Sequence, residues 1–324
     1  MDLLSKASSS IAAALLSGVF AAGAFAQSYP TKTVRVISPT GPSGGADMQA
    51  RLMSKRLTES MGQSFFVDNR PGASGNIGAE VVAKAPPDGY TLLVTSSLIA
   101  VSTLFYKKLA FDPLKDLAPI SQIASAPQVL VVHPSVPVKS VKELVALARR
   151  QPGRLNVGSS GSGSINHIAL EMFRQPARIE VTHIPYKSGA ASSTALMSGE
   201  VDFIFAGIVQ ALPLLRSQRA RAIAVTSLTP SGVLPGVPTM DTFYPGFSSA
   251  NWYAMFAPTG TPPAIINRLH AEIVSALKTP EIRDFITGEG AVPVGSSPQE
   301  FAAYLRSEIE RYAKVVKAGN LKLD

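Results

Sequence analysis

The chain has 324 residues, of which 46% are hydrophobic and 16% are charged, and it contains no cysteine. This composition excludes a disordered chain, a disulfide-stabilised fold and a lipidated N-terminal cysteine. The net charge of +8 comes from scattered lysines and arginines. Without a basic stripe, this charge argues against nucleic-acid binding and favours a mild attraction for anionic solutes.

The N-terminus has the pattern of an export signal. Lys6 supplies a positive charge, residues 11–25 are almost all apolar or small, and Ala24-Phe25-Ala26 is a small-x-small cleavage site. We therefore expect residues 1–26 to be a signal peptide, cleaved after Ala26, and the mature protein to be periplasmic. An uncleaved anchor is the alternative. The remaining chain, roughly 300 residues long, is too large for one hydrophobic core, so two domains are expected.

The first stretch after the leader joins a strand, a loop of small residues and a helix. The β-branched run 34–37 ends at the Gly/Pro/Ser loop 38–45, and an amphipathic pattern with Ala50, Met53 and Leu57 on one face follows. Such a loop leaves backbone N–H groups unpaired at the positive end of the helix. It therefore predicts a site that an anion can approach.

The order of strand, loop and helix recurs through residue 226. Expected strands lie at 65–67, 90–95, 128–132, 155–158, 179–184, 201–205 and 221–226, with helices between most of them. Ser140 and Glu143 form a capping box for one of these helices. Apolar strands that alternate with helices are typical of an α/β fold with mostly parallel sheets flanked by helices.

The last quarter differs. An expected strand at 252–257 is followed by helices at 262–278, 280–287 and 298–318, each opened by a hydroxyl residue and a proline. We expect residues 27–125 plus 252–324 to form domain 1 and residues 126–251 to form domain 2. Two crossings between the domains predict a hinge with the ligand cleft between them.

Five Gly/Ser loops occupy the carboxyl ends of expected strands, where ligands of open parallel sheets bind. They lie at 38–45, 72–76 and 96–97 in domain 1 and at 158–164 and 185–189 in domain 2. A ligand that touches loops of both domains would favour the closed state. A tight turn is the alternative reading of any single loop.

Individual polar residues have competing interpretations. Asp47 is expected to orient its loop or a water rather than touch the ligand, and His167 to be structural rather than a base. Tyr186 and Lys187 are either a solvated pair or partners of a carboxylate. Trp252, the single tryptophan, is expected in the core, with a ligand contact near the hinge as the alternative.

Enzyme signatures are weak. Gly158-Ser-Ser-Gly-Ser162 departs from G-x-S-x-G at its last position, no Walker motif occurs, and the four histidines are far apart in sequence. No metal or cofactor is therefore expected. A serine hydrolase that uses Ser160 with His167 stays as an unfavoured alternative.

Several longer motifs indicate a family. They are Pro39-x-x-Pro42 with Gly44 and Asp47, Asp68-Asn-Arg-Pro-Gly-Ala-Ser-Gly-Asn-Ile-Gly78, Pro87-Asp-Gly-Tyr-Thr-Leu-Leu93, His183-Ile-Pro-Tyr-Lys187 and Ala257-Pro-Thr-Gly-Thr-Pro262. Over nearly the whole mature chain the sequence resembles the tripartite tricarboxylate transporter receptors, the Bug family. The resemblance implies a type II periplasmic binding protein of Venus-flytrap form, which is no enzyme. Such a receptor captures a small organic carboxylate and delivers it to membrane permease subunits. A carboxylate sensor that serves a signalling partner is the alternative.

The loops and the resemblance together give the candidate ligand-binding residues, which are Thr40, Gly41, Ser43, Asp47, Ser74, Gly75, Asn76, Ser97, Ser160, Ser162, Ser164, His167, Tyr186, Lys187 and Ala206. The sequence departs from the family pattern at Ala206, where many members have aspartate, and at Leu98 and Ile99, where polar residues are frequent. Fewer polar partners disfavour a highly hydroxylated or zwitterionic ligand. We therefore expect a carboxylate with an aromatic or otherwise apolar body.

Overall fold

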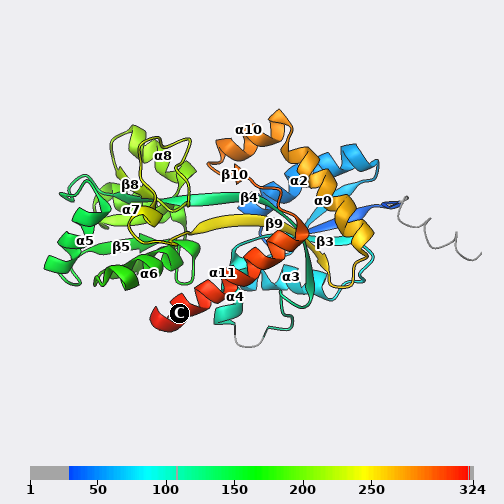
Figure 1. The fold of residues 1–324 in the computed structure, drawn as a ribbon, viewed down its shortest axis with the longest axis horizontal. Helices are drawn as coiled ribbons and strands as arrows, with labels where there is room; N and C mark the ends of the chain where they lie inside the picture. Colours follow the sequence, from blue (N-terminus) through cyan, green and yellow to red (C-terminus); the bar gives the residue numbers. More distant parts are fainter. Residues whose placement is uncertain (1–28, 107–108, 320, 322–324) are drawn as a thin grey trace, which may run out of the picture.

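The computed structural model describes residues 29–106, 109–319 and 321. The predicted signal peptide lies outside these residues. Figure 1 shows two lobes side by side, joined by the long strands β4 (Leu117–Val132) and β9 (Ala250–Pro258), with the C-terminal helix α11 (Pro298–Gly319) running along both. Within the described ranges, no helix has both the length and the apolar character needed to cross a membrane.

Each lobe contains strands that belong to it alone and helices that cover them. The first lobe holds β1 (Val34–Ser38), β2 (Phe65–Asn69), β3 (Thr91–Ser96), β10 (Val292–Pro293), the short helix η1 (Ala73–Gly75), α2 (Gly45–Met61), α3 (Asn76–Ala83), α4 (Leu98–Phe105), α9 (Pro263–Leu277) and α10 (Pro280–Gly288). The second lobe holds β5 (Asn156–Ser159), β6 (Thr182–Pro185), β7 (Phe203–Gly207), β8 (Arg221–Val225), α5 (Val141–Arg150), α6 (Ile165–Ala177), α7 (Gly189–Ser198), α8 (Ile208–Arg216) and the short helix η2 (Met240–Thr242).

The strands of the described chain form one continuous sheet in the order β2-β1-β3-β9-β4-β7-β5-β6, with β8 and β10 also paired to β4. β1 is parallel to β2 and β3, and β5 is parallel to β6 and β7. β9 is antiparallel to β3 and β4, and β4 is antiparallel to β7. The predicted α/β class is confirmed. The sheet is mixed where the lobes meet, because one linking strand leaves the first lobe and the other returns to it.

The linking strand β4 is much longer than the predicted strand 128–132. Its first part, from Leu117 to Pro127, pairs with β9, and its second part, from Gln128, pairs with β7 and β8. Prolines and polar residues in the first part hide the strand from sequence patterns. The change of pairing partner falls next to the predicted crossing at residue 126, and the division into two domains stays a prediction.

Helix starts follow the capping rules only in part. The predicted box at α5 is confirmed, because the N–H of Glu143 donates to Ser140 Oγ over 3.2 Å and the N–H of Lys139 donates to the Glu143 carboxylate. Ser297 caps α11, where the N–H of Glu300 donates to Ser297 Oγ over 3.2 Å and the N–H of Ser297 donates to the Glu300 carboxylate over 2.8 Å. Thr261 and Thr279, also expected to cap, instead donate their hydroxyls to preceding carbonyls.

Buried apolar side chains of the described chain form three clusters. One runs unbroken through both lobes, from Ile37 and Leu93 past Trp252 to Phe173 and Phe203, and includes residues of α11. Trp252 is fully buried, as expected for core packing. A second cluster belongs to the first lobe between β1, α2 and α9. The third belongs to the second lobe between β7, α7 and α8.

Candidate ligand-binding site

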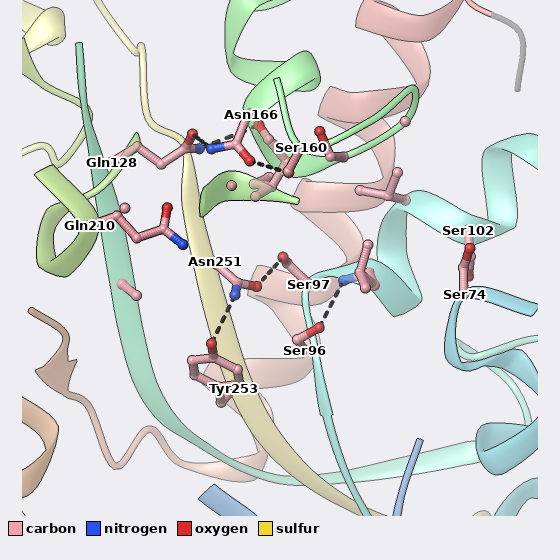
Figure 2. Close-up of a pocket in the computed structure, with 18 of the residues that line it drawn as sticks. Ser74, Ser96, Ser97, Ser102, Gln128, Ser160, Asn166, Gln210, Asn251 and Tyr253 are labelled. Atoms are coloured by element: carbon pink, nitrogen blue, oxygen red, sulfur yellow. Dashed lines mark hydrogen bonds between the residues drawn. The ribbon is translucent and has the colours of Figure 1, made fainter. Parts of the chain in front are cut away.

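A cavity of about 590 Å³ lies between the two lobes. The first lobe contributes Ser74, the end of β3 and one side of α4, and the second lobe contributes the β5–α6 loop and the starts of α7 and α8. Gln128 of β4 and Asn251 and Tyr253 of β9 also line the cavity (Figure 2). The site therefore combines both lobes with the two strands that join them.

Four of the described helices begin at this cavity. Residues lining it include Leu98 of α4, Ile165 of α6, Gly189 of α7 and Ile208 of α8, each the first residue of its helix. First-turn N–H groups have no partner inside their helix and carry partial positive charge. Serine side chains at the N-cap position cap α6 and α7, whereas the N-cap residues of α4 and α8 make no such bond. In α4 the N–H of Leu98 donates instead to Ser96 Oγ over 3.4 Å.

The described residues that line the cavity include no lysine, arginine or histidine, and Glu289 is the charged one among them. An anion in this cavity would therefore be held by backbone N–H groups, hydroxyls and amides. These are the groups that bind anions at helix N-termini in general.

A hydrogen-bonded network of the second lobe runs along one wall. The hydroxyl of Ser160 donates to Asn166 Oδ1 over 2.5 Å, and Asn166 Nδ2 donates to Gln128 Oε1 over 2.9 Å. Asn166 Nδ2 also donates to the carbonyl of Phe205 over 2.6 Å. Because His167 Nδ1 accepts from the N–H of Gly163, the Ser160 proton is not directed to a histidine base. This geometry gives no support to the serine hydrolase alternative.

A second hydrogen-bonded network joins β9, one of the two strands that link the lobes, to Ser97 of the first lobe. The hydroxyl of Ser97 donates to Asn251 Oδ1 over 2.8 Å, and Asn251 Nδ2 donates to the hydroxyl of Tyr253 over 2.9 Å (Figure 2). Burial, together with the negative charge of Glu289, raises the pKa of Tyr253. Its phenol therefore stays protonated at neutral pH.

Apolar side chains also line the cavity. They include Leu98, Val101 and Phe105 of α4 and Ile165 of α6. The helix α4 itself was not predicted from the sequence, because its β-branched and aromatic residues do not favour a helix. The cavity thus presents both hydrogen-bonding and apolar side chains.

Five of the fifteen candidate residues line the cavity, namely Ser74, Ser97, Ser160, Ser162 and Ser164. The other ten do not, and they are Thr40, Gly41, Ser43, Asp47, Gly75, Asn76, His167, Tyr186, Lys187 and Ala206. Direct ligand contact stays a prediction for all fifteen.

The first loop, 38–45, is separated from the cavity by Tyr253. A Cβ atom on Gly45 would lie 2.3 Å from the tyrosine hydroxyl, so the ring packs directly on the start of α2. The loop follows the carboxyl end of β1, where ligands of open parallel sheets bind. The sequence pattern does not show that a side chain from β9 covers the loop.

Asp47 holds the first loop in shape. Its carboxylate is 1% exposed and accepts from the N–H of Ser43, Arg51 Nε and Asn69 Nδ2 at 2.9, 2.9 and 2.7 Å. Asn69 also donates to the carbonyl of Thr40. Burial alone would raise the pKa of Asp47, but these hydrogen bonds and the charge of Arg51 outweigh it and hold the pKa below its usual value.

We expect Asp47→Asn to lower the free energy of unfolding by about 2 kcal/mol at pH 7, because a buried acceptor of three donors becomes partly a donor. A depressed pKa stabilises the fold above the unfolded-state pKa, and this stabilisation is lost as pH falls through the folded-state pKa. Urea unfolding at pH 7, 5 and 3.5 should therefore show a constant difference from wild type at the two higher values and a smaller one at the lowest. A difference that grew toward acid pH would contradict this role.

Other candidates outside the cavity have structural partners. Asn76 Oδ1 accepts from Ser102, which does line the cavity. His167 stacks on His183 with ring centroids 4.0 Å apart, in line with the structural role expected for it. The hydroxyl of Tyr186 donates to Glu200, and burial followed by this contact raises the pKa of Tyr186 to about 12. Ala206 is 2% exposed within β7 and Lys187 is exposed.

Sequence reasoning missed several lining residues. Asn251 and Tyr253 stand two apart on β9, on the face opposite the buried Trp252, and the period of two in a strand is a signal that was available. The segment 207–210 also follows a strand and opens a helix, but it lacks the run of glycines and serines that drew attention to the other loops. In the described part of the chain, no group of His, Cys, Asp and Glu residues is suited to a metal ion.

Comparisons with known proteins show similarity over most of the chain. A model of the tripartite tricarboxylate transporter family receptor matches residues 49–321. BugT of Bordetella pertussis is 34% identical over 306 residues, which cover 94% of each chain. The solved structure of R. palustris Rpa4515 with adipate is 36% identical, with a TM-score of 0.76, and covers 91% of this chain and 100% of that one. MatC from Rhodopseudomonas palustris with bound malate is 31% identical, with a TM-score of 0.72, over 89% and 100% of the two chains.

Proposed function

Because the chain belongs to the tripartite tricarboxylate transporter receptor family, we propose that it captures a small organic carboxylate between its lobes and delivers it to the permease subunits of such a transporter. The family consists of receptors rather than enzymes, and they are periplasmic. The observation that carries the proposal is the convergence of four helix N-termini on a cavity without a basic side chain among its described lining residues.

This arrangement suits a carboxylate. Two carboxylate oxygens accept several hydrogen bonds, and backbone N–H groups at helix starts supply them with a favourable dipole. The absence of a fixed cation among the described lining residues also suits a receptor that must release its ligand, since a desolvated ion pair would be costly to break. A cationic solute would meet repulsive dipoles at the four helix starts.

The size of the cavity and the apolar side chains that line it narrow the ligand class. Its volume of about 590 Å³ lies within the range of small-molecule sites. The relatives solved with adipate and malate hold small organic acids. Here the side chains of α4 and Ile165 favour a carboxylate with an aromatic or otherwise apolar body, because burial of such a body against them releases water.

The proposal includes a hinge and an exported mature chain. The two domains would be residues 27–125 plus 252–324 and residues 126–251. They would move about the point where β4 stops pairing with β9 and starts pairing with β7. The lobes also contact each other at the edge of the cavity, because a Cβ on Gly290 would lie 3.0 Å from Ile208. We also propose cleavage after Ala26, outside the described residues.

Thermal-shift screening of residues 27–324 tests this function. The panel contains mono-, di- and tricarboxylates, and the matched methyl esters and amines are the controls. A ligand at a hundred times its Kd stabilises the folded state by about 2.7 kcal/mol, so carboxylates should raise Tm by several degrees whereas esters and amines should not. Aromatic acids should exceed citrate, and no turnover should be detected. If no acid in the panel shifts Tm, the proposal fails.

A further inference from the structure

The Ser160 network has a fixed hydrogen-bond direction, because backbone carbonyls set its two amides. Gln128 Nε2 donates to the carbonyl of Ile165 over 3.3 Å and to Ser249 Oγ over 3.0 Å. Its Oε1 atom must then face Asn166. Turning this amide over would place its oxygen against the carbonyl oxygen of Ile165 and its NH2 group against Asn166 Nδ2, so that two acceptors would meet on one side and two donors on the other.

Asn166 is fixed by the same reasoning. Its Nδ2 donates to the carbonyl of Phe205 over 2.6 Å and to Gln128 Oε1 over 2.9 Å. Both amide hydrogens are thereby used, and Oδ1 faces the hydroxyl of Ser160 at 2.5 Å. Since Oδ1 can only accept, Ser160 must donate.

A serine hydroxyl has a single proton, and this one is committed to Asn166. Ser160 lines the cavity between the lobes, so what it presents to a ligand is lone pairs alone. A carboxylate also presents lone pairs alone, and the two oxygens would repel each other. The group that fits against Ser160 is a hydrogen-bond donor.

We propose that Ser160 is a specificity-determining residue that accepts a hydrogen bond from a hydroxyl or N–H group on the ligand, rather than a group that binds the carboxylate. This inference rests on the proposed function, and it refines the ligand to an apolar-bodied carboxylate that carries a donor. The carboxylate then lies at the start of α8, which has no side-chain cap, and Ser160 recognises the donor group.

Isothermal titration of the mature protein with matched acids tests the assignment. The probes are benzoate against its three monohydroxy derivatives, 3-phenylpropionate against 3-(4-hydroxyphenyl)propionate, and succinate against malate. In the wild type, at least one hydroxylated acid should bind about tenfold more tightly than its parent, as a hydrogen bond to a buried acceptor allows. In Ser160→Ala this advantage should disappear, while the affinity for the parent acid changes less than threefold.

Ser74→Ala is the control variant. Ser74 also lines the cavity, but on the first lobe, where its hydroxyl contacts that of Tyr106 at 3.2 Å. It should keep the preference for the hydroxylated acid. Three results would overturn the inference: no hydroxylated acid preferred by the wild type, a preference that survives Ser160→Ala, or an equal loss for both members of a pair, as expected if a water joined Ser160 to the carboxylate. If no acid binds at all, the proposed function itself fails.

Discussion

Replacing Gly207 with aspartate is expected to weaken carboxylate binding more than a hundredfold without loss of the fold. Gly207 precedes α8, lines the cavity and has φ −58° and ψ 144°, which any N-cap residue adopts. A Cβ there would meet its nearest atom, Gln210 Oε1, at 3.8 Å. An aspartate would therefore cap α8 and place a negative charge where the ligand's charge must lie. Two such charges 4 Å apart repel by about 4 kcal/mol at an effective dielectric constant of 20.

Gly207→Asn is the matched control, because asparagine caps the same N–H groups without the charge. We expect it to weaken binding about tenfold or less, so the ratio between the two variants measures the electrostatic part. Calorimetry with the tightest acid of the thermal-shift panel gives both values. The ligand-free Tm of each variant should equal or exceed that of the wild type. Equal losses in the two variants would mean that the carboxylate does not lie at the start of α8.

Glu308→Ala is expected to lower the free energy of unfolding by about 3–5 kcal/mol, the usual cost of removing one partner of a buried charge pair. Glu308 is 1% exposed on α11. Its carboxylate accepts from Trp252 Nε1 over 3.3 Å, from Arg311 and from the hydroxyl of Tyr312. Truncation would leave all three donors without this acceptor, and Trp252 belongs to the strand that links the lobes.

Guanidinium unfolding followed by the fluorescence of Trp252 measures this effect, since the chain has no other tryptophan. Glu308→Gln keeps the side-chain length and one carbonyl oxygen, so it should lose clearly less stability than the alanine variant. The slope of the transition should stay unchanged if unfolding remains two-state. An alanine variant within 1 kcal/mol of wild type would show that these contacts contribute little.

Local signals in the sequence were enough for most of the fold. The predicted helices 280–287 and 298–318 agree with α10 and α11 to within one residue, because periodicity and proline placement act within one helix. The first part of β4 was missed because strand pairing decides it. Residues such as Pro119, Ser121 and Gln122 are tolerated there through the irregular pairing with β9, and no short window of sequence contains that partner.

The candidate site was predictable to the extent that backbone rules locate it. The expectation that ligands bind at the carboxyl ends of strands pointed to Ser97 and to Ser160, Ser162 and Ser164, which do line the cavity. It could not show that Tyr253, about two hundred residues further along the chain, covers the loop that begins α2. It also could not show that Ser160 is oriented by Gln128 and by backbone carbonyls, because these contacts exist only after the lobes are assembled.

The shared apolar cluster limits how the lobes can separate. This cluster passes unbroken from one lobe to the other and includes residues of α11, while the two remaining clusters each stay within one lobe. Separating the lobes on the side of α11 would therefore expose tightly packed side chains to solvent. Parting them between α8 and the end of α10 would break only small contacts such as that of Gly290 with Ile208. We therefore expect the lobes to stay in contact on the side of α11 and to separate between α8 and the end of α10, where the solute would enter.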